Sequence, residues 1–189
     1  KKLFGAETIL CINISSAELY TKSISDHFCD CADRHGVDAR LIEIELTETF
    51  AVKLGEQSRR NIEILRAKGF RISIDDFGAG YTSVQQIIEY PAETIKLDRE
   101  LVESLTRSAA LPTLRALIAL CHAQDMLVIA EGVDTPEKMS LLAAAGCDLY
   151  QGYLISRPLS LDDLGVWAMQ RLLDTARETM RSAERRAQG

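Results

Sequence analysis

The sequence predicts an α/β fold, namely a TIM-type (β/α) barrel that is incomplete at its N-terminus. Short strand-like runs alternate with helical segments along the chain, a pattern typical of a parallel sheet with right-handed crossovers. Almost every predicted strand ends in a polar residue, as in barrels that collect their chemistry from many strand ends. No G-x-G-x-x-G or Walker-type loop follows a strand, which removes the main sign of an open nucleotide-binding sheet.

Six strands are expected, at residues 8–15, 41–48, 71–77, 94–98, 126–133 and 149–155. Start and stop signals mark the helices between them. The first helix is expected to begin with a capping box from Ser15 to Glu18, and Gly36 fits a helix end. Gly69 closes a helix that runs from about Ala51, and a further helix has Pro136 in its first position and Gly146 just past its end. Residues 100–124, with Pro112 interrupting or restarting the helix, and residues 161–186 are also expected to be helical. Such a barrel needs about eight strands and about 250 residues, so two strands and roughly 50–70 residues are expected before Lys1.

The chain is expected to form one barrel domain over residues 1–189, lacking its first strands and ending in a frayed tail over 181–189. Its formal charge of −6 argues against a general DNA-backbone binder. Five irregularly spaced cysteines indicate reduced thiols and a cytoplasmic protein. No apolar run approaches the roughly 18 residues of a membrane span.

Polar side chains at the strand ends predict a metal site. They are Asn13, Glu45, Asp75, Asp76, Lys96, Glu131 and Gln151. The period of two places Glu43, Glu45 and Thr47 on one face of their strand, which we expect to point into the barrel. Adjacent carboxylates such as Asp75 and Asp76 repel, so a proton or a cation must lie near them. Carboxylate and amide oxygens favour Mg²⁺ or Mn²⁺, and four carboxylates favour two ions about 3.5–4 Å apart that share an aspartate.

Structural alternatives exist for each of these residues. A single acid at a strand end is commonly a helix cap or a surface charge. Acids at the ends of several successive strands are harder to explain as caps or surface charges. Lys96 could form a structural ion pair or a Schiff base, but surrounding acids keep an ammonium charged and disfavour the second role. Gln151 could simply satisfy buried backbone groups.

Two other groups of residues invite a functional interpretation. His27, Cys31 and His35 form one helical stripe that imitates a metal cluster, but the stripe spans some 12 Å of helix axis, too far for one ion. Trp167, Met169 and Leu172 in the last helix are expected to be core residues rather than a partner surface.

The motifs CINISS, EIELTET, IDDFGAGYTS, IKLDR, VIAEGVDT and QGYLISRP, in that order over residues 8 to about 160, resemble the EAL-domain phosphodiesterases of bacterial cyclic di-GMP signalling. The resemblance implies a TIM-type barrel that hydrolyses cyclic di-GMP to linear pGpG by two-metal activation of water with Mg²⁺ or Mn²⁺. It also implies a homodimer that is part of a longer multidomain sensor protein. The alternative is a catalytically inactive receptor for cyclic di-GMP or for a protein partner.

The resemblance assigns a role to each matching residue. The implied metal ligands are Asn13, Glu45, Asp75, Asp76 and Glu131. Lys96 would hold or polarise the attacking water together with Glu131, and Gln151 would support that water or the metal ligands. The segment from Phe77 to Ser83 resembles the flexible loop that couples metal and substrate binding to dimerisation, with Gly78 and Gly80 supplying backbone freedom and Glu48 anchoring it.

The sequence also departs from the family pattern. The Glu-Ala-Leu motif, whose glutamate is a metal ligand, is absent from these residues, as is the nearby arginine that contacts substrate phosphate. Both would lie on the strands expected before Lys1, and a protein that lacked that glutamate would be a weak or inactive enzyme. Asp134 stands where the family commonly has glutamate, which would loosen a loop contact, and Ala79 replaces a common threonine.

Overall fold

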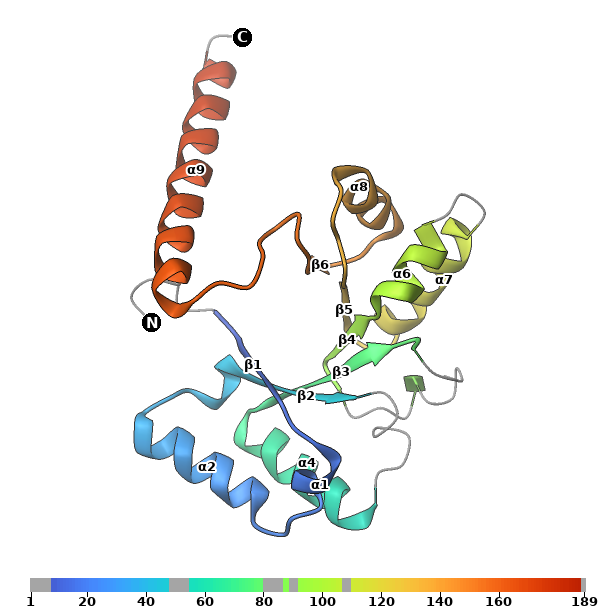
Figure 1. The fold of residues 1–189 in the computed structure, drawn as a ribbon, viewed down its shortest axis with the longest axis vertical. Coiled ribbons are helices and arrows are strands. Elements are labelled where there is room, and N and C mark those ends of the chain that lie inside the picture. The colour runs from blue at the N-terminus through green and yellow to red at the C-terminus, as the bar shows by residue number, and fades with distance from the viewer. Residues whose placement is uncertain (1–7, 48–54, 80–86, 89–91, 107–109, 188–189) are drawn as a thin grey trace. The chain divides into compact units, whose positions relative to one another are not determined.

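The computed structural model describes residues 8–47, 55–79, 87–88, 92–106 and 110–187 (Figure 1). The chain divides into two compact units, of which Ile9–Ile155 carries the sheet, while the segment from Ser156 onward belongs to the other. The extent of the domain over 1–189 stays a prediction.

Six parallel strands form one sheet in which every strand pairs with its neighbours in sequence order. They are β1 (Leu10–Asn13), β2 (Ile42–Thr47), β3 (Arg71–Phe77), β4 (Thr94–Leu97), β5 (Leu127–Ala130) and β6 (Leu149–Tyr150). The number, order and parallel direction predicted from the sequence are confirmed. The sheet is the six-stranded part of a TIM-type barrel, with β1 and β6 at its edges.

The last strand is much shorter than predicted, because β6 covers two residues rather than 149–155. The chain turns after Tyr150, where the backbone N–H of Val133 donates to Gln151 O and that of Leu154 donates to Val133 O. Gly152 lies so close to the Val133 backbone that a Cβ there would collide with it. This local packing replaces the strand.

Helices follow the strands as the punctuation predicted. They are α1 (Ser16–Leu19), α2 (Ile24–His35), α4 (Glu56–Lys68), α6 (Arg99–Thr106), α7 (Leu111–His122), α8 (Pro136–Ala145) and α9 (Leu161–Ala187), with the 3₁₀ turn η1 (Ala39–Leu41). The Ser15–Glu18 capping box forms, and left-handed glycines end α2, α4 and α8. Pro112 lies in the first turn of α7, so it starts a new helix.

The core lies between the sheet and the helices that follow its strands. Alternate residues of the strands, such as Ile44, Ile72, Ile74, Ile95 and Val128, are fully buried. Helices α2 and α4 pack together, as do α6, α7 and α8 (Figure 1). Because strand residues alternate between faces, the polar residues between these apolar ones lie on the opposite, inner face of the sheet.

The C-terminal segment agrees with one prediction and contradicts another. Helix α9 covers Leu161–Ala187, in agreement with the helix expected over 161–186, while the frayed tail expected over 181–189 stays a prediction. Met169 and Leu172 are exposed, so their assignment to the core was wrong.

No helix in the described part of the chain is long and apolar enough to cross a bilayer. All five cysteines are free thiols, as predicted.

Candidate metal and phosphodiester site

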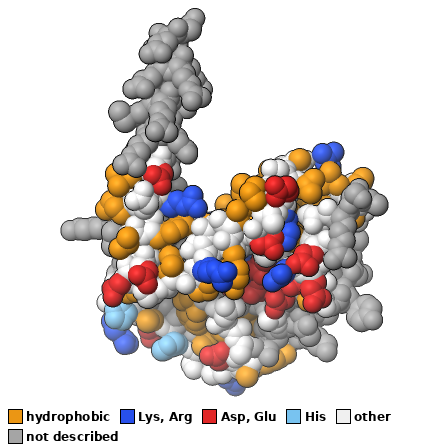
Figure 2. All heavy atoms as spheres, turned by 45° about the horizontal axis from the view of Figure 1, so that its top comes forward, with side chains coloured by type: hydrophobic (Ala, Val, Ile, Leu, Met, Phe, Trp, Pro, Cys, Tyr) orange, Lys and Arg blue, Asp and Glu red, His pale blue; other side chains and the backbone are white. Residues whose placement is uncertain are grey.

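Lys96 of β4 lies at the centre of a cluster of carboxylates contributed by β2, β3 and the end of β5. Its Nζ is 2.8 Å from Glu131, 2.9 Å from Asp75 and 3.2 Å from Glu45, and its side chain is only 6% exposed. We call this cluster the acidic mouth and define it as Glu45, Asp75, Asp76, Lys96 and Glu131. Within it, four carboxylates surround one ammonium. The surface view shows acidic side chains gathered on one part of the molecule, with basic side chains among them (Figure 2).

Asp75 and Asp76 reach the same site although they are adjacent in a strand, where successive side chains point to opposite faces. A β-bulge resolves this conflict. Ile74 pairs with Ile95 and Phe77 pairs with Leu97, so three residue steps along β3 lie opposite two steps along β4. Asp76 also adopts a left-handed backbone with φ of +56°. One ligand oxygen from each of Asp75, Asp76 and Glu131 consequently lies within 4.8 Å of the others.

The charge imbalance of the acidic mouth appears in the pKa values of its members. Burial and the neighbouring Asp75 and Asp76 raise the pKa of Glu131 despite the opposing effect of Lys96. Partial removal from water, together with Asp75 and Asp98, raises the pKa of Asp76. These directions agree with our expectation of a strained or partly protonated site in the absence of cations.

Lys96 is held in its ammonium form. Burial alone would lower its pKa, but the hydrogen bonds and charges of Glu131 and Asp75 outweigh that effect and raise the pKa above its ordinary value. A protonated amine cannot attack a carbonyl, so the acidic mouth does not suit a Schiff-base lysine. Asp98, by contrast, accepts bonds from the backbone N–H groups of Glu100 and Leu101 and is a helix cap.

The donor set fits a hard divalent cation. Asp75, Asp76 and Glu131 offer three carboxylate oxygens at a common point, which is the ligand chemistry of Mg²⁺ and Mn²⁺ rather than of thiolate-bound zinc. A bound cation would have to share these carboxylate oxygens with the Lys96 ammonium. Asp75, Asp76 and Glu131 are therefore the residues that could hold the metal.

A second polar group lies two residues earlier on the same inner face. Glu43, which is 3% exposed, accepts a hydrogen bond from Thr94 Oγ1 at 2.9 Å and pairs with Arg71 Nε at 3.3 Å. We call Glu43, Arg71 and Thr94 the inner polar layer. Cys11 Sγ also lies within reach of Glu43 and Glu45, but the Glu43 carboxylate is already paired, so we do not assign a metal there.

The remaining predicted residues are placed as follows. Asn13 ends β1 directly opposite Glu45 in the parallel register, which brings it next to the acidic mouth. The Gln151 side chain is exposed, while its backbone bonds to Ala130 and Val133. Phe77 is buried and Gly78 has a φ of +97°. Glu48 and Gly80 lie outside the described residues, as does the loop beyond Ala79.

Asp134 does not join the acidic mouth in any contact that the structure describes. Its carboxylate pairs with Lys138 Nζ at 2.8 Å, one turn into α8. This pairing lowers the pKa of Asp134. Sequence reasoning assigned no role to Lys138, Glu103 or Arg71. The i,i+4 spacings of Asp134 with Lys138 and of Arg99 with Glu103 were readable signals. The contacts of Glu103 with Lys138 and of Arg71 with Glu43 join separate elements and left no such signal.

The His27, Cys31 and His35 stripe lines an apolar pocket of about 260 Å³ together with residues such as Phe28, Ile12 and Ile42. Within the described residues these three side chains do not bring ligand atoms to a common point.

Comparison with known proteins decides the family. Residues 2–158 match the EAL domain. The chain belongs to the EAL domain family. The Vibrio cholerae biofilm architecture maintenance protein MbaA is 38% identical over 156 residues, which cover 82% of this chain and 20% of MbaA.

Solved EAL structures share the fold. The phosphodiesterase PaMucR in complex with c-di-GMP has a TM-score of 0.74 and 30% identity, with 82% of this chain and 64% of that chain covered. Klebsiella pneumoniae BlrP1 in a manganese and cyclic di-GMP complex has a TM-score of 0.75 and 31% identity, covering 81% of this chain and 39% of that one. This EAL chain spans about a fifth to a quarter of the length of curated relatives such as MbaA.

Proposed function

We propose that this EAL domain is a metal-dependent phosphodiesterase that hydrolyses cyclic di-GMP to linear pGpG. The observation that carries the proposal is the acidic mouth itself, in which Asp75, Asp76 and Glu131 converge on one point and surround Lys96. Four carboxylates and one ammonium leave excess negative charge where a phosphodiester would bind, so the site needs cations to accept its substrate. The manganese and cyclic di-GMP complex of BlrP1 supports the same ligand pair.

The protein residues have separable tasks in this reaction. Asp75, Asp76, Glu45, Glu131 and Asn13 would hold two Mg²⁺ or Mn²⁺ ions, which would supply positive charge against the phosphodiester and a more acidic water. Lys96 Nζ, fixed by Asp75 and Glu131, would donate to the attacking water. That water adds to phosphorus, one ribose–phosphate bond breaks, and the departing ribose oxygen takes up a proton.

The remaining assignments come from family membership. Gln151 would support the water or the ligands, and the loop containing Phe77, Gly78 and Gly80, with Glu48 and Asp134, would respond to substrate. A homodimer, a cytoplasmic location and an extent of the domain over 1–189 stay predictions.

The direct test is to incubate the full-length protein that contains this chain with cyclic di-GMP and Mg²⁺ or Mn²⁺, and to separate the nucleotides by chromatography. We expect pGpG to accumulate with metal and to be absent with EDTA. Tight binding of cyclic di-GMP without any pGpG would reject the enzyme and favour the receptor alternative.

A further inference from the structure

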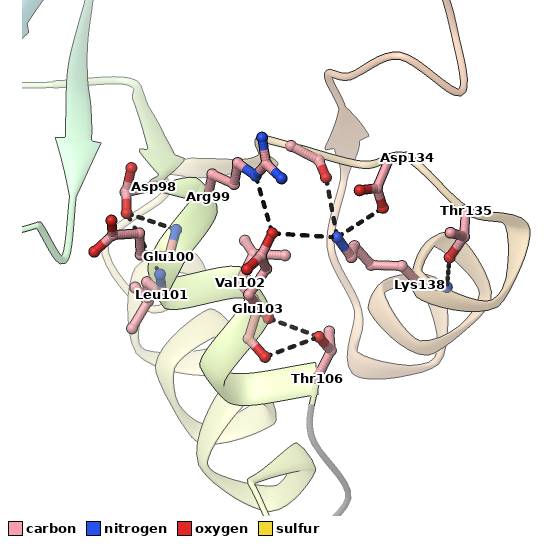
Figure 3. Close-up of polar contacts among 11 residues, drawn as sticks. Asp98, Arg99, Glu100, Leu101, Val102, Glu103, Thr106, Asp134, Thr135 and Lys138 are labelled. Carbon is pink, nitrogen blue, oxygen red and sulfur yellow. Dashed lines mark hydrogen bonds and ion pairs between the residues drawn. The ribbon is translucent and has the colours of Figure 1, made fainter.

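A polar network outside the acidic mouth joins the two helices that follow its central strands. Helix α6 begins at Arg99, three residues after Lys96, and α8 begins at Pro136, five residues after Glu131. Figure 3 shows Arg99 and Glu103 of α6 pointing toward Lys138 of α8. The same two strand–helix units therefore meet twice, inside through Lys96 and Glu131 and outside through this network.

Lys138 is the cation at the centre of the network. Its side chain is 13% exposed, and its Nζ lies 2.8 Å from Asp134 Oδ1, 3.2 Å from Gly132 O and 4.0 Å from Glu103 Oε1. An ammonium has three donors, and a largely buried one is stable only where acceptors surround it. The three acceptors come from α6, from the loop before α8 and from the Gly132–Val133 peptide.

Glu103 and Arg99 hold this arrangement from the α6 side. Arg99 Nε donates to Glu103 Oε1 at 2.9 Å, the same oxygen that faces Lys138. The Arg99 stem also packs on the backbone of Gly132, because a Cβ at that position would collide with Arg99 Cγ. Gly132 is left-handed, with a φ of +65°, so neither its conformation nor its surroundings admit a larger residue.

The network contacts the backbone at Gly132, the residue directly after Glu131. The backbone N–H of Glu131 donates to Leu97 O at 3.1 Å, which extends the β4–β5 ladder to that residue. One residue further, the Gly132 carbonyl accepts a hydrogen bond from Lys138 Nζ, and the side chain of Arg99 packs against the Gly132 backbone. The direction in which the Glu131 carboxylate leaves the backbone is thereby set from both sides.

We propose that Lys138, Glu103 and Arg99 are positioning residues that fix the backbone at Gly132, directly after Glu131, so that the Glu131 carboxylate faces the oxygens of Asp75 and Asp76. The inference rests on the proposed function, since it assigns these residues to that site. A ligand carboxylate that is not held in place binds a cation more weakly, because its freedom is lost on binding. The network holds Glu131 in place before the cation arrives.

The test measures Mn²⁺ affinity without nucleotide, by electron paramagnetic resonance of free Mn²⁺, in the full-length protein. Lys138→Met keeps the length of the side chain and removes its donors, and we expect Mn²⁺ affinity to fall by about tenfold. Lys138→Gln retains a donor for Gly132 O and is expected to fall in between. Lys68→Met is the control, because Lys68 of α4 also joins two helices, through Asp33 of α2 at 2.7 Å, and lies near the start of β3, whereas Asp75 and Asp76 lie near its end.

A purely structural role predicts a different pattern, namely equal losses of thermal stability in Lys138→Met and Lys68→Met with unchanged Mn²⁺ affinity. That result would overturn the inference. Should Lys138→Met not fold, Glu103→Gln removes one charge from the network, and unchanged Mn²⁺ affinity in that variant would overturn it equally. A protein that binds Mn²⁺ without hydrolysing cyclic di-GMP would reject the proposed function alone, whereas failure of the unsubstituted protein to bind Mn²⁺ would reject both.

Discussion

The acidic mouth and the inner polar layer lie two residues apart on the same strands, yet their charges are arranged in opposite ways. In the inner polar layer one buried acid, Glu43, is matched by Arg71 and by the Thr94 hydroxyl. In the acidic mouth one ammonium, Lys96, is shared among Glu45, Asp75 and Glu131, with Asp76 beside them. The matched layer pairs its buried charge within the protein, whereas the unmatched one leaves acids that added cations would stabilise. The difference supports the acidic mouth as the proposed site of chemistry.

The largest expected effect is on turnover. Asp75→Asn should abolish hydrolysis of cyclic di-GMP, by about 10³-fold or more, because a metal contributes several kcal/mol of transition-state stabilisation. The same change removes one of four clustered negative charges, so the metal-free protein should unfold at an equal or higher temperature. Product chromatography and thermal melts in EDTA measure both. Retained turnover would refute the role of Asp75, and Asp33→Asn serves as the control for a surface acid.

Removal of the cation from each region sharpens the contrast. Lys96→Met should destabilise the metal-free protein by about 3 kcal/mol, since it leaves buried acids unpaired. Arg71→Met should destabilise it similarly by isolating Glu43. Added Mn²⁺ should restore stability to Lys96→Met alone, as measured by denaturant unfolding. If Mn²⁺ restored the stability of Lys96→Met and Arg71→Met equally, the acidic mouth and the inner polar layer would not differ in their response to cations.

The pH dependence of metal stabilisation follows from the raised pKa values. Asp76 and Glu131 have folded pKa values above their ordinary 3.8 and 4.5, so they favour folding at low pH and this contribution is lost as pH rises through the raised values. Mn²⁺ binds the deprotonated groups and offsets that loss, by about 2.7 kcal/mol at a hundredfold excess over Kd. The rise in melting temperature on adding Mn²⁺ should therefore grow between about pH 4.5 and pH 7. An equal rise at both ends would contradict the assignment.

The smallest effect is expected in the inner polar layer. Glu43→Gln weakens the ion pair with Arg71 and keeps an acceptor for Thr94, and it should destabilise the protein by about 1.5 kcal/mol. Mn²⁺ affinity should stay within about twofold of that of the unsubstituted protein, since Glu43 is not expected to contact the cation. Titration of Mn²⁺ against this variant checks the result. A tenfold loss of affinity would merge the two regions into one site.

Local regularities made much of this architecture predictable. The alternation of strands and helices, the left-handed glycines at Gly36, Gly69 and Gly146, and the inward parity of Glu45 depend on residues close together in the chain. Their physical basis is the geometry of one strand or one helix end. The same regularities overestimated the length of β6. The chain leaves the strand early because Gly152 packs against the backbone of Val133, which lies beyond the end of β5.

The sequence by itself determined which side chains reach the carboxyl ends of the strands, and hence that acids and Lys96 would meet there. Only the tertiary structure decided how they meet. The β3 bulge that turns both Asp75 and Asp76 to one side, the pairing of Glu43 with Arg71, and the link between Lys138 and Glu103 all depend on the register and packing of segments far apart in the chain. Local periodicity carries no information about those distances, because they are set by how whole strands and helices pack against one another.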